Sequence, residues 1–222
     1  MEAENYSSSL PGINSGAADS WTTTTTINGF SGDGAVQALP NDSSNMGLSK
    51  NGPSLLYEIE FQTAGTYYVY IRGHAPAPSG VNDSVHVGLN GTAVTTASGF
   101  GLTGFDDNGF NWENHSNSNS DTTILIPTPG TYTFNLWMRE DGVAVDKIEL
   151  SQTQNLYNNG STAVGNSESP CAASEGDTLV RLNAGGPTVT TGGQTWQADD
   201  NYVTGGKKYS NGSVSAITNT TD

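Results

Sequence analysis

Ser54-Leu-Leu-Tyr-Glu-Ile-Glu-Phe61 alternates apolar and polar residues, and Gly65-Thr-Tyr-Tyr-Val-Tyr-Ile-Arg72 repeats the pattern after a glycine turn. Successive side chains of a β-strand point to opposite faces, so this alternation is typical of strands with one buried face. The residues expected to point inward are Leu55, Tyr57, Ile59, Phe61, Tyr67, Val69 and Ile71.

Short strands separated by turn residues continue in both directions along the first 150 residues. Asn90-Gly91 follows one of them and is a strong signal for a two-residue hairpin. The further expected strands are 1–6, 34–39, 84–89, 92–96, 122–127, 130–138 and 145–150. No window shows sustained helical periodicity, so the sequence predicts an all-β fold, an antiparallel β-sandwich of the jelly-roll type.

The amino-acid composition of the sequence changes after Ser151. We expect residues 1–151 to form the sandwich and residues 152–177, rich in Gln, Asn, Gly and Ser, to form a linker. Residues 178–222 begin with a predicted strand, Thr178–Leu182, but hold too few apolar side chains for a core of their own. They are expected to be a partial β segment.

Charge and composition exclude several classes of protein. Seven basic and 22 acidic residues give a net charge of −15, which is unsuited to binding nucleic acid. No apolar run approaches the 18 or so residues that span a bilayer, so we expect no membrane insertion. One cysteine, Cys171, permits no intrachain disulfide. The surface rich in Asn, Thr and Gly favours a secreted, extracellular protein whose signal peptide lies upstream of Met1.

Four stretches in this order resemble the β-sandwich carbohydrate-binding modules related to families six and thirty-five. They are Glu2–Tyr6, Gly65–Gly73, Asp83–Gly91 and Arg139–Leu150. The resemblance covers about residues 1–151 and implies a non-catalytic domain that binds polysaccharide or oligosaccharide within a multi-domain protein. A second set of motifs, in 181–186, 195–199 and 202–206, is similar to the start of malectin-type domains, which also bind sugars.

The first resemblance also implies a structural calcium site. Glu2 and Glu4 lie two residues apart and so share a face of the expected first strand, and the last strand carries Asp146. In the resembling modules, acids at these positions bind Ca²⁺. A loop carbonyl near Asn28 or Asp33 would complete the oxygen ligands that this ion requires. On the pattern alone, three acids in an acidic protein are expected to be solvated.

Sugar recognition requires an aromatic face and planar polar groups, and two arrangements offer them. Strand parity places Tyr70 and Arg72 on the outer face of one strand, and Trp137 and Arg139 on the outer face of another. Aromatic residues there can instead pack beneath a covering loop. The other arrangement is at the loop end, with Trp112 as the platform. The polar residues expected around it are His74, Asp83, Arg139, Glu140 and Asp141. An ion pair within Arg139–Glu140 is the structural alternative.

Catalysis is not expected. Glycosidases need two carboxyl groups on opposite sides of the scissile bond, and adjacent acids such as Glu140 and Asp141 point apart. The sequence contains no nucleophile elbow, phosphate loop or dinucleotide motif.

Two functions of different class remain. The first is a non-catalytic carbohydrate-binding module, stabilised by calcium, within a secreted protein. The alternative is an assembly subunit of a filament, surface layer or adhesin, in which the C-terminal segment self-associates by adding its strand to a neighbouring chain.

Overall fold

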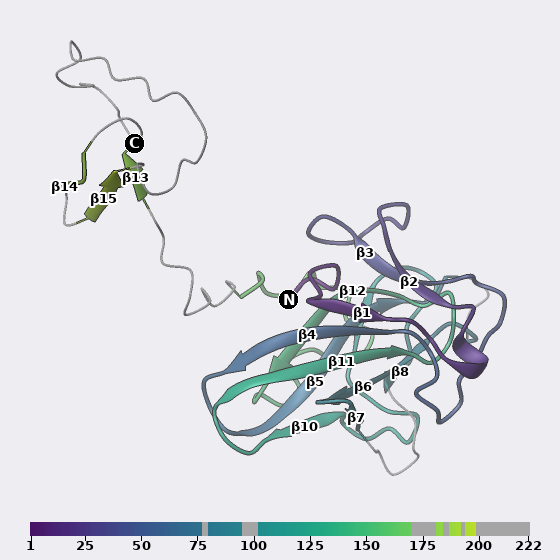
Figure 1. Cartoon of the computed structure of the whole chain (residues 1–222). Helices are drawn as coiled ribbons and strands as arrows, with labels where there is room; N and C mark the ends of the chain where they lie inside the picture. Colours follow the sequence, from purple (N-terminus) through teal and green to yellow (C-terminus); the bar gives the residue numbers. More distant parts are fainter. Residues whose placement is uncertain (77–79, 95–101, 170–180, 184–186, 192–193, 199–222) are drawn as a thin grey trace. The chain divides into compact units, whose positions relative to one another are not determined.

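The computed structural model describes residues 1–76, 80–94, 102–169, 181–183, 187–191 and 194–198 (Figure 1). The chain divides into two compact units, Met1–Pro170 and Cys171–Asp222. Among the described residues of both units the regular structure is mostly strand, and the helix there is a single 3-10 turn, Asn14–Gly16. No helix in this part of the chain has the length and apolar character needed to span a membrane.

The first unit contains two antiparallel sheets, each six-stranded within the described residues. Sheet I has the order β1-β4-β11-β6-β7, with β8 also paired to β6. Its strands are β1 (Ser8–Leu10), β4 (Ser54–Phe61), β6 (Ser84–Leu89), β7 (Thr92–Ala93), β8 (Leu102–Thr103) and β11 (Gly130–Met138). The bounds of β4 and β11 are those predicted from the alternation of their side chains.

Sheet II has the order β10-β5-β12-β3-β2, with β9 also paired to β5. Its strands are β2 (Ser20–Thr24), β3 (Ala35–Leu39), β5 (Gly65–His74), β9 (Asn111–Glu113), β10 (Thr123–Ile126) and β12 (Ala144–Ser151). The antiparallel β-sandwich predicted from the sequence is therefore confirmed.

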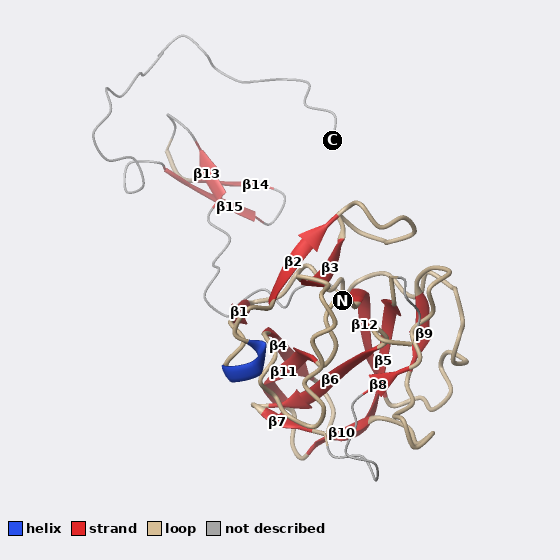
Figure 2. Ribbon diagram, turned by 90° about the vertical axis from the view of Figure 1, so that its right-hand side faces the viewer, coloured by secondary structure: helices blue, strands red, loops and turns tan. Residues whose placement is uncertain are grey.

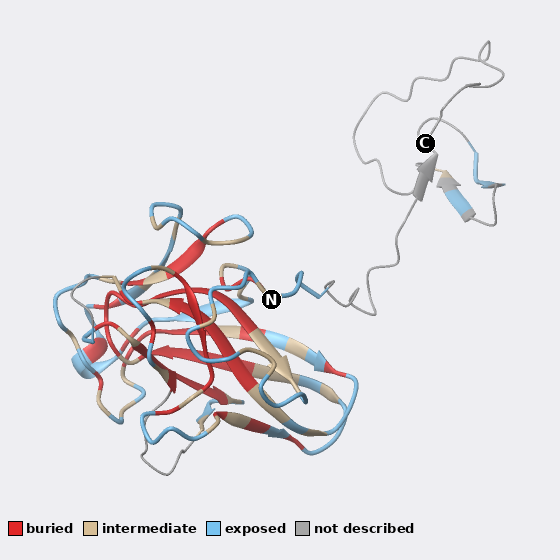
Figure 3. Cartoon of the chain, turned by 180° about the vertical axis from the view of Figure 1, so that it is seen from behind, coloured by how far each residue is buried: buried red, intermediate tan, exposed pale blue. Residues whose placement is uncertain are grey.

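One hydrophobic core lies between the sheets, and its buried strands form the centre of the first unit (Figure 3). Leu55, Tyr57 and Phe61 of β4 contribute from sheet I, and Val69 and Ile71 of β5 contribute from sheet II. These are residues that the alternation predicted to point inward. Burying apolar side chains of this size stabilises the fold by about 1.5–3 kcal/mol each.

A β-bulge in β12 separates charged residues from this core. The register with β5 shifts between Val145 and Lys147, and both Val145 and Ile148 belong to the core although they are three residues apart. The extra residue leaves Asp146 and Lys147 on the outer side, where their charges find polar partners.

The expected first strand is shorter and later than predicted. Glu2 forms an isolated bridge to Lys147, and the first strand proper is β1. The reason is that the backbone at Met1–Ala3 bonds to β12 of sheet II, with Ala3 N donating to Asp146 O, whereas Ser7 N donates to Leu56 O of sheet I. The chain crosses between sheets here, so it cannot form one continuous strand.

Residues 152–168, predicted as part of a linker, instead lie on the outer side of sheet II, and we call them the strap. Trp112 N donates to Ser161 O at 2.8 Å, and Gly160 N donates to Trp112 O at 3.0 Å. Backbone hydrogen bonds of this kind need no apolar side chains, which explains why a polar composition did not indicate them. The compact unit accordingly extends beyond residue 151 to Pro170.

The second unit contains a three-stranded sheet among its described residues, with the order β13-β15-β14 (Figure 2). β13 (Arg181–Asn183) pairs in parallel with β15 (Gln194–Ala198), which pairs antiparallel with β14 (Val189–Thr191). β13 overlaps the end of the strand predicted at Thr178–Leu182, and residues 178–180 lie outside the described residues.

Candidate functional site

A groove of about 540 Å³ lies on the outer face of sheet I. It combines one indole ring with aliphatic, amide, hydroxyl and ammonium groups. We call it the sheet-face groove; its lining residues are Leu10, Lys50, Ser54, Leu56, Asn90, Gly91, Thr133, Asn135 and Trp137.

Strand register builds the floor of this groove. Asn135 and Trp137 alternate along β11 with the buried Leu136, so they point away from the core. On the neighbouring β4, Asn135 lies opposite Leu56 and Trp137 lies opposite Ser54. An aromatic ring, an amide and an aliphatic side chain therefore meet on one surface.

The hairpin at Asn90-Gly91 forms one wall of the groove. Both residues have positive φ, 50° and 76°, as a two-residue hairpin turn requires. Asn135 Oδ1 accepts a hydrogen bond from Gly91 N at 2.7 Å, and Asn90 Oδ1 accepts one from Thr133 N at 3.0 Å. These bonds fix the two amides and leave their NH₂ groups as donors toward a ligand.

Lys50 lies over the indole ring of Trp137. Its Nζ is 5.3 Å from the ring centroid and donates to Gly91 O at 2.6 Å. The Trp137 residue is 7% exposed in this arrangement. Because Lys50 is exposed and its side chain is long and flexible, its displacement would open the ring face to the groove.

Trp112, the predicted sugar platform, is completely buried. Its ring stacks on Tyr157 of the strap at a centroid distance of 4.3 Å and an interplanar angle of 8°. Its Nε1 donates to Ala163 O at 2.8 Å. Both the ring face and the N–H are therefore engaged by the strap, and the expectation of an exposed platform is corrected.

Tyr70 and Arg72 are covered by the same strap. Tyr70 is 1% exposed and meets Tyr157 edge-on, and its hydroxyl donates to Thr153 O at 3.1 Å. Arg72 Nε donates to Ala163 O at 3.1 Å. The expectation that their face binds sugar is likewise corrected, because a covering segment occupies it.

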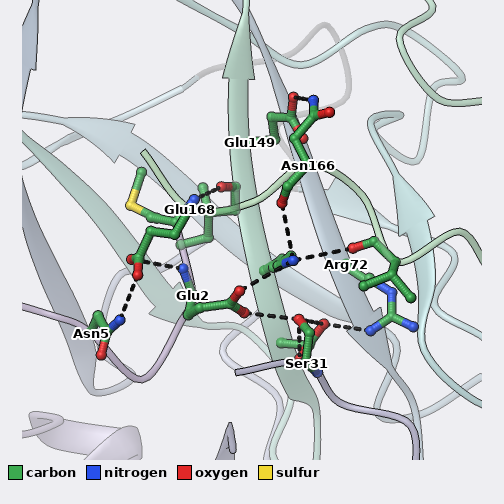
Figure 4. A network of polar contacts seen from close by, with 12 residues as sticks. Glu2, Asn5, Ser31, Arg72, Glu149, Asn166 and Glu168 are labelled. Carbon is green, nitrogen blue, oxygen red and sulfur yellow. Dashed lines mark hydrogen bonds and ion pairs between the residues drawn. The ribbon is translucent and has the colours of Figure 1, made fainter. Parts of the chain in front are cut away.

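Two of the residues expected to bind calcium, Glu2 and Asp146, meet at Ser31 of the 28–33 loop (Figure 4). Ser31 Oγ donates to Glu2 Oε2 at 2.9 Å and also contacts the carboxylate of Asp146. Asp33 N donates to Glu4 Oε1 at 2.9 Å, and Glu4 Oε2 is buried without a hydrogen-bond partner. Burial, together with the charges of Glu2 and Asp146, raises the pKa of Glu4.

Two cations already contact this carboxylate group. Arg72 forms an ion pair with Asp146, and Lys147 Nζ lies 3.2 Å from Glu2 Oε1. The end of the strap closes the network, because Glu168 accepts hydrogen bonds from Glu2 N at 3.1 Å and Asn5 Nδ2 at 2.9 Å (Figure 4). Glu4 Oε2 is the carboxylate oxygen of Glu2, Glu4 and Asp146 that lacks a partner in the structure.

A sequence model of the glycosyl hydrolase family 115 C-terminal domain matches residues 1–159. The chain belongs to this family. No curated protein matches the chain.

Several solved structures resemble the family 115 domain. A Podospora anserina GH26-CBM35 β-(1,4)-mannanase gives a TM-score of 0.45 at 20% identity, covering 69% of this chain and 27% of that one. A Paenibacillus sp. cycloisomaltooligosaccharide glucanotransferase gives 0.43 at 18% identity, covering 67% of this chain and 17% of that one. A CBM35 from Paenibacillus barcinonensis gives 0.37 at 18% identity, covering 66% of this chain and 99% of that one. The chain thus spans a small part of the two enzymes.

The two aromatic-plus-arginine faces of the family 115 domain do not meet. β5, which carries Tyr70 and Arg72, belongs to sheet II, whereas β11, which carries Trp137, belongs to sheet I. Both sets point away from the shared core, so they lie on opposite outer faces of the sandwich. Of the predicted sheet-face residues, Trp137 alone lines the groove.

At the loop end, the structure brings together Asp83, Arg139 and Glu140. Arg139 Nη1 lies 2.8 Å from Glu140 Oε1 and donates to Ser84 Oγ at 2.6 Å. Glu140 Oε2 accepts from Asp83 N at 3.1 Å, and burial followed by the proximity of Glu140 raises the pKa of Asp83 to about 6. The polar atoms of these residues mostly bond to one another. This agrees with the alternative in which Arg139 and Glu140 form a structural ion pair.

The remaining two loop-end residues have separate partners. His74 Nδ1 lies 2.9 Å from Asp106 O, and its ring packs near Phe110. Asp141 is completely buried beside Asp19 and Asp42 instead of facing the other loop-end residues.

Glu113 is a buried acid that the sequence did not single out. Its Oε1 accepts from Asn111 Nδ2 at 2.8 Å and from Gly160 N of the strap at 3.0 Å. Burial outweighs these bonds and raises its pKa to about 7. Asn111 lies on the same strand, but Gly160 is 47 residues further along the chain, so no local pattern indicates that Glu113 is buried.

The raised pKa of Glu113 predicts a pH-dependent stability. The folded state holds this proton more tightly than the unfolded state, whose pKa is near 4.5. Stability from this group is therefore present below about pH 4.5 and is lost as the pH rises through about 7. The melting temperature of Glu113→Gln minus that of the wild type should therefore be larger at pH 8 than at pH 5. Differential scanning fluorimetry at both pH values measures this, and an unchanged difference between the two proteins would contradict it.

Proposed function

We propose that the family 115 domain is a non-catalytic carbohydrate-binding module of a larger secreted protein that acts on polysaccharide. The observation that carries the proposal is the sheet-face groove, where Trp137 lies beside amide and hydroxyl groups. Family membership supports the same conclusion, because the family is that of a C-terminal domain of glycosyl hydrolases.

The chemistry of the groove suits a neutral sugar chain. An indole ring packs against the C–H face of a pyranose, while fixed donors and acceptors bind its hydroxyl groups. Asn90 and Asn135 supply amide donors, and Thr133 supplies a hydroxyl. Lys50 would leave the ring face and donate to a sugar hydroxyl. The net charge of −15 disfavours strongly anionic polysaccharides.

The groove also lacks the groups of a glycosidase. None of its lining residues is an aspartate or a glutamate. Both retaining and inverting hydrolysis generally require a pair of carboxyl groups across the scissile bond. The groove is thus equipped to hold a sugar and not to cleave it.

Affinity electrophoresis tests the binding function. The full chain should migrate more slowly in gels that contain a neutral polysaccharide such as a xylan, mannan or β-glucan than in gels without one. Serum albumin run in the same gels controls for sieving. An unchanged mobility in every polysaccharide gel would refute the proposal.

Calcium at Glu2, Glu4 and Asp146 is the second part of the proposal. The buried Glu4 Oε2 supports it, since an ion would supply the partner that this oxygen lacks. Calcium bound there would join the N-terminal segment, the 28–33 loop and β12.

Removal of calcium is therefore expected to destabilise the domain. EDTA should lower the melting temperature of the wild type, and Glu4→Gln should reduce that calcium-dependent shift. Glu60→Gln, a change of the same kind at an exposed position of β4, serves as the control. A melting temperature of the wild type that is insensitive to EDTA would contradict the calcium site.

A further inference from the structure

A second group of acids lies apart from the sheet-face groove and from the Glu2–Glu4–Asp146 site. One carboxylate oxygen each from Asp19, Asp42 and Asp141 lies within 4.8 Å of the other two. Asp19 precedes β2, Asp42 follows β3, and Asp141 lies in the turn between β11 and β12. The group therefore joins three segments that are distant in sequence.

Burial makes this group unlike a solvated acidic patch. Asp19 is 4% exposed, and neither of its carboxylate oxygens has a hydrogen-bond partner in the structure. Asp141 is completely buried, and its Oδ1 also lacks a partner. Buried polar groups nearly always have partners, and an isolated buried charge is costly. Three oxygens without partners in one place indicate a missing ligand.

Positive charge from the protein does not fill this place. Among the described residues, no lysine, arginine or histidine forms an ion pair with any of the three aspartates. The hydrogen bonds within the group come from its own loop, with Asp42 N donating to Asp141 Oδ2 and Ser44 Oγ donating to Asp42 Oδ1 at 3.0 Å. Burial and the charges of Asp141 and Asp42 raise the pKa of Asp19.

We propose that Asp19, Asp42 and Asp141 bind a calcium ion. Calcium takes oxygen ligands at about 2.3–2.6 Å, so two ligands on opposite sides of the ion lie about 4.6–5.2 Å apart. One oxygen from each of the three aspartates lies within 4.8 Å of the other two, so a single ion of this size can contact all three. Magnesium requires near-ideal octahedral geometry and gives up its water ligands reluctantly, so we expect it to bind this group more weakly.

The exposed side chain of Asp42 gives the ion access from solvent. The two buried carboxylates would hold its inner side, and water would complete its coordination. The bound ion would fix the 40–44 loop and the β11–β12 turn to the start of β2.

Measuring the affinity for calcium tests the proposal. Isothermal titration calorimetry of the metal-free full chain with CaCl₂ is expected to show a binding event that Asp19→Asn weakens at least tenfold. Glu4→Gln should leave this event unchanged, which distinguishes it from calcium at the Glu2–Glu4–Asp146 site. Titration with MgCl₂ should give at least tenfold weaker binding. A calcium isotherm that is identical for the wild type and Asp19→Asn would overturn the proposal.

Thermal unfolding with and without calcium provides a second measurement, which distinguishes loss of calcium binding from general destabilisation. Without calcium, Asp19→Asn removes a buried charge next to two others, so its melting temperature should equal or exceed that of the wild type. With calcium in excess, the wild type should become the more stable protein. A melting temperature of Asp19→Asn that is lower by the same amount in both conditions would show a purely structural role and refute the site.

Discussion

Replacing Trp137 by alanine is expected to weaken polysaccharide binding by about 10- to 100-fold, because aromatic side chains at the centre of a binding surface commonly contribute about 1.4–3 kcal/mol. Trp137 supplies the only aromatic ring among the groove-lining residues of the described structure. Its removal leaves the neighbouring amides without the apolar surface against which a sugar ring would pack. Isothermal titration calorimetry with an oligosaccharide of the retarded polysaccharide measures the change.

Trp196→Ala is the matched control for this experiment. Trp196 is 39% exposed and lies on β15 of the second unit, outside the groove. The same tryptophan-to-alanine change there should leave the affinity within about twofold of the wild type. Equal affinities for the wild type and Trp137→Ala would refute the sheet-face groove as the binding site.

Replacing Trp112 by alanine should act on stability instead of on binding. Truncation of a buried tryptophan typically destabilises a protein by about 3–5 kcal/mol. Here the change also removes the stacking with Tyr157 and the hydrogen bond to Ala163 O that attach the strap. Chemical denaturation should show a correspondingly lower free energy of unfolding.

The conservative variant Trp112→Phe separates packing from the hydrogen bond. It retains an aromatic face toward Tyr157 but loses the N–H donor, so its destabilisation should be smaller than that of Trp112→Ala. Both variants should bind sugar with wild-type affinity at temperatures where they are folded. A loss of affinity without a loss of stability would instead restore Trp112 as a sugar platform.

The strands could be predicted because their signal is local. In β4 and β11 alternate side chains belong to the core, such as Leu55 and Tyr57 or Phe134 and Leu136, and this alternation indicates which face of each strand points inward. The order of strands in a sheet depends on pairing between distant segments. The sequence of one strand does not indicate which strand it will pair with. Tyr70 and Trp137 therefore look equivalent in sequence, although one lies under the strap and the other lines the groove.

The strap and the acidic group could not be predicted for related reasons. Residues 152–168 attach through backbone hydrogen bonds and through Tyr157, so their polar composition resembles that of a linker. Asp19, Asp42 and Asp141 are distant in sequence and become neighbours only after folding. Only the family resemblance indicates Glu2, Glu4 and Asp146 as metal ligands, because three acids in an acidic protein carry no such signal by themselves.

The tryptophan indole resonances provide the most direct test of the sheet-face groove. The chain has four tryptophans, so a ¹H–¹⁵N spectrum resolves each indole N–H during titration with the bound oligosaccharide. The N–H of Trp137 is expected to shift progressively until saturation, while that of Trp112 stays in place. A shift of the Trp112 resonance with no change at Trp137 would contradict the groove as the sugar-binding site.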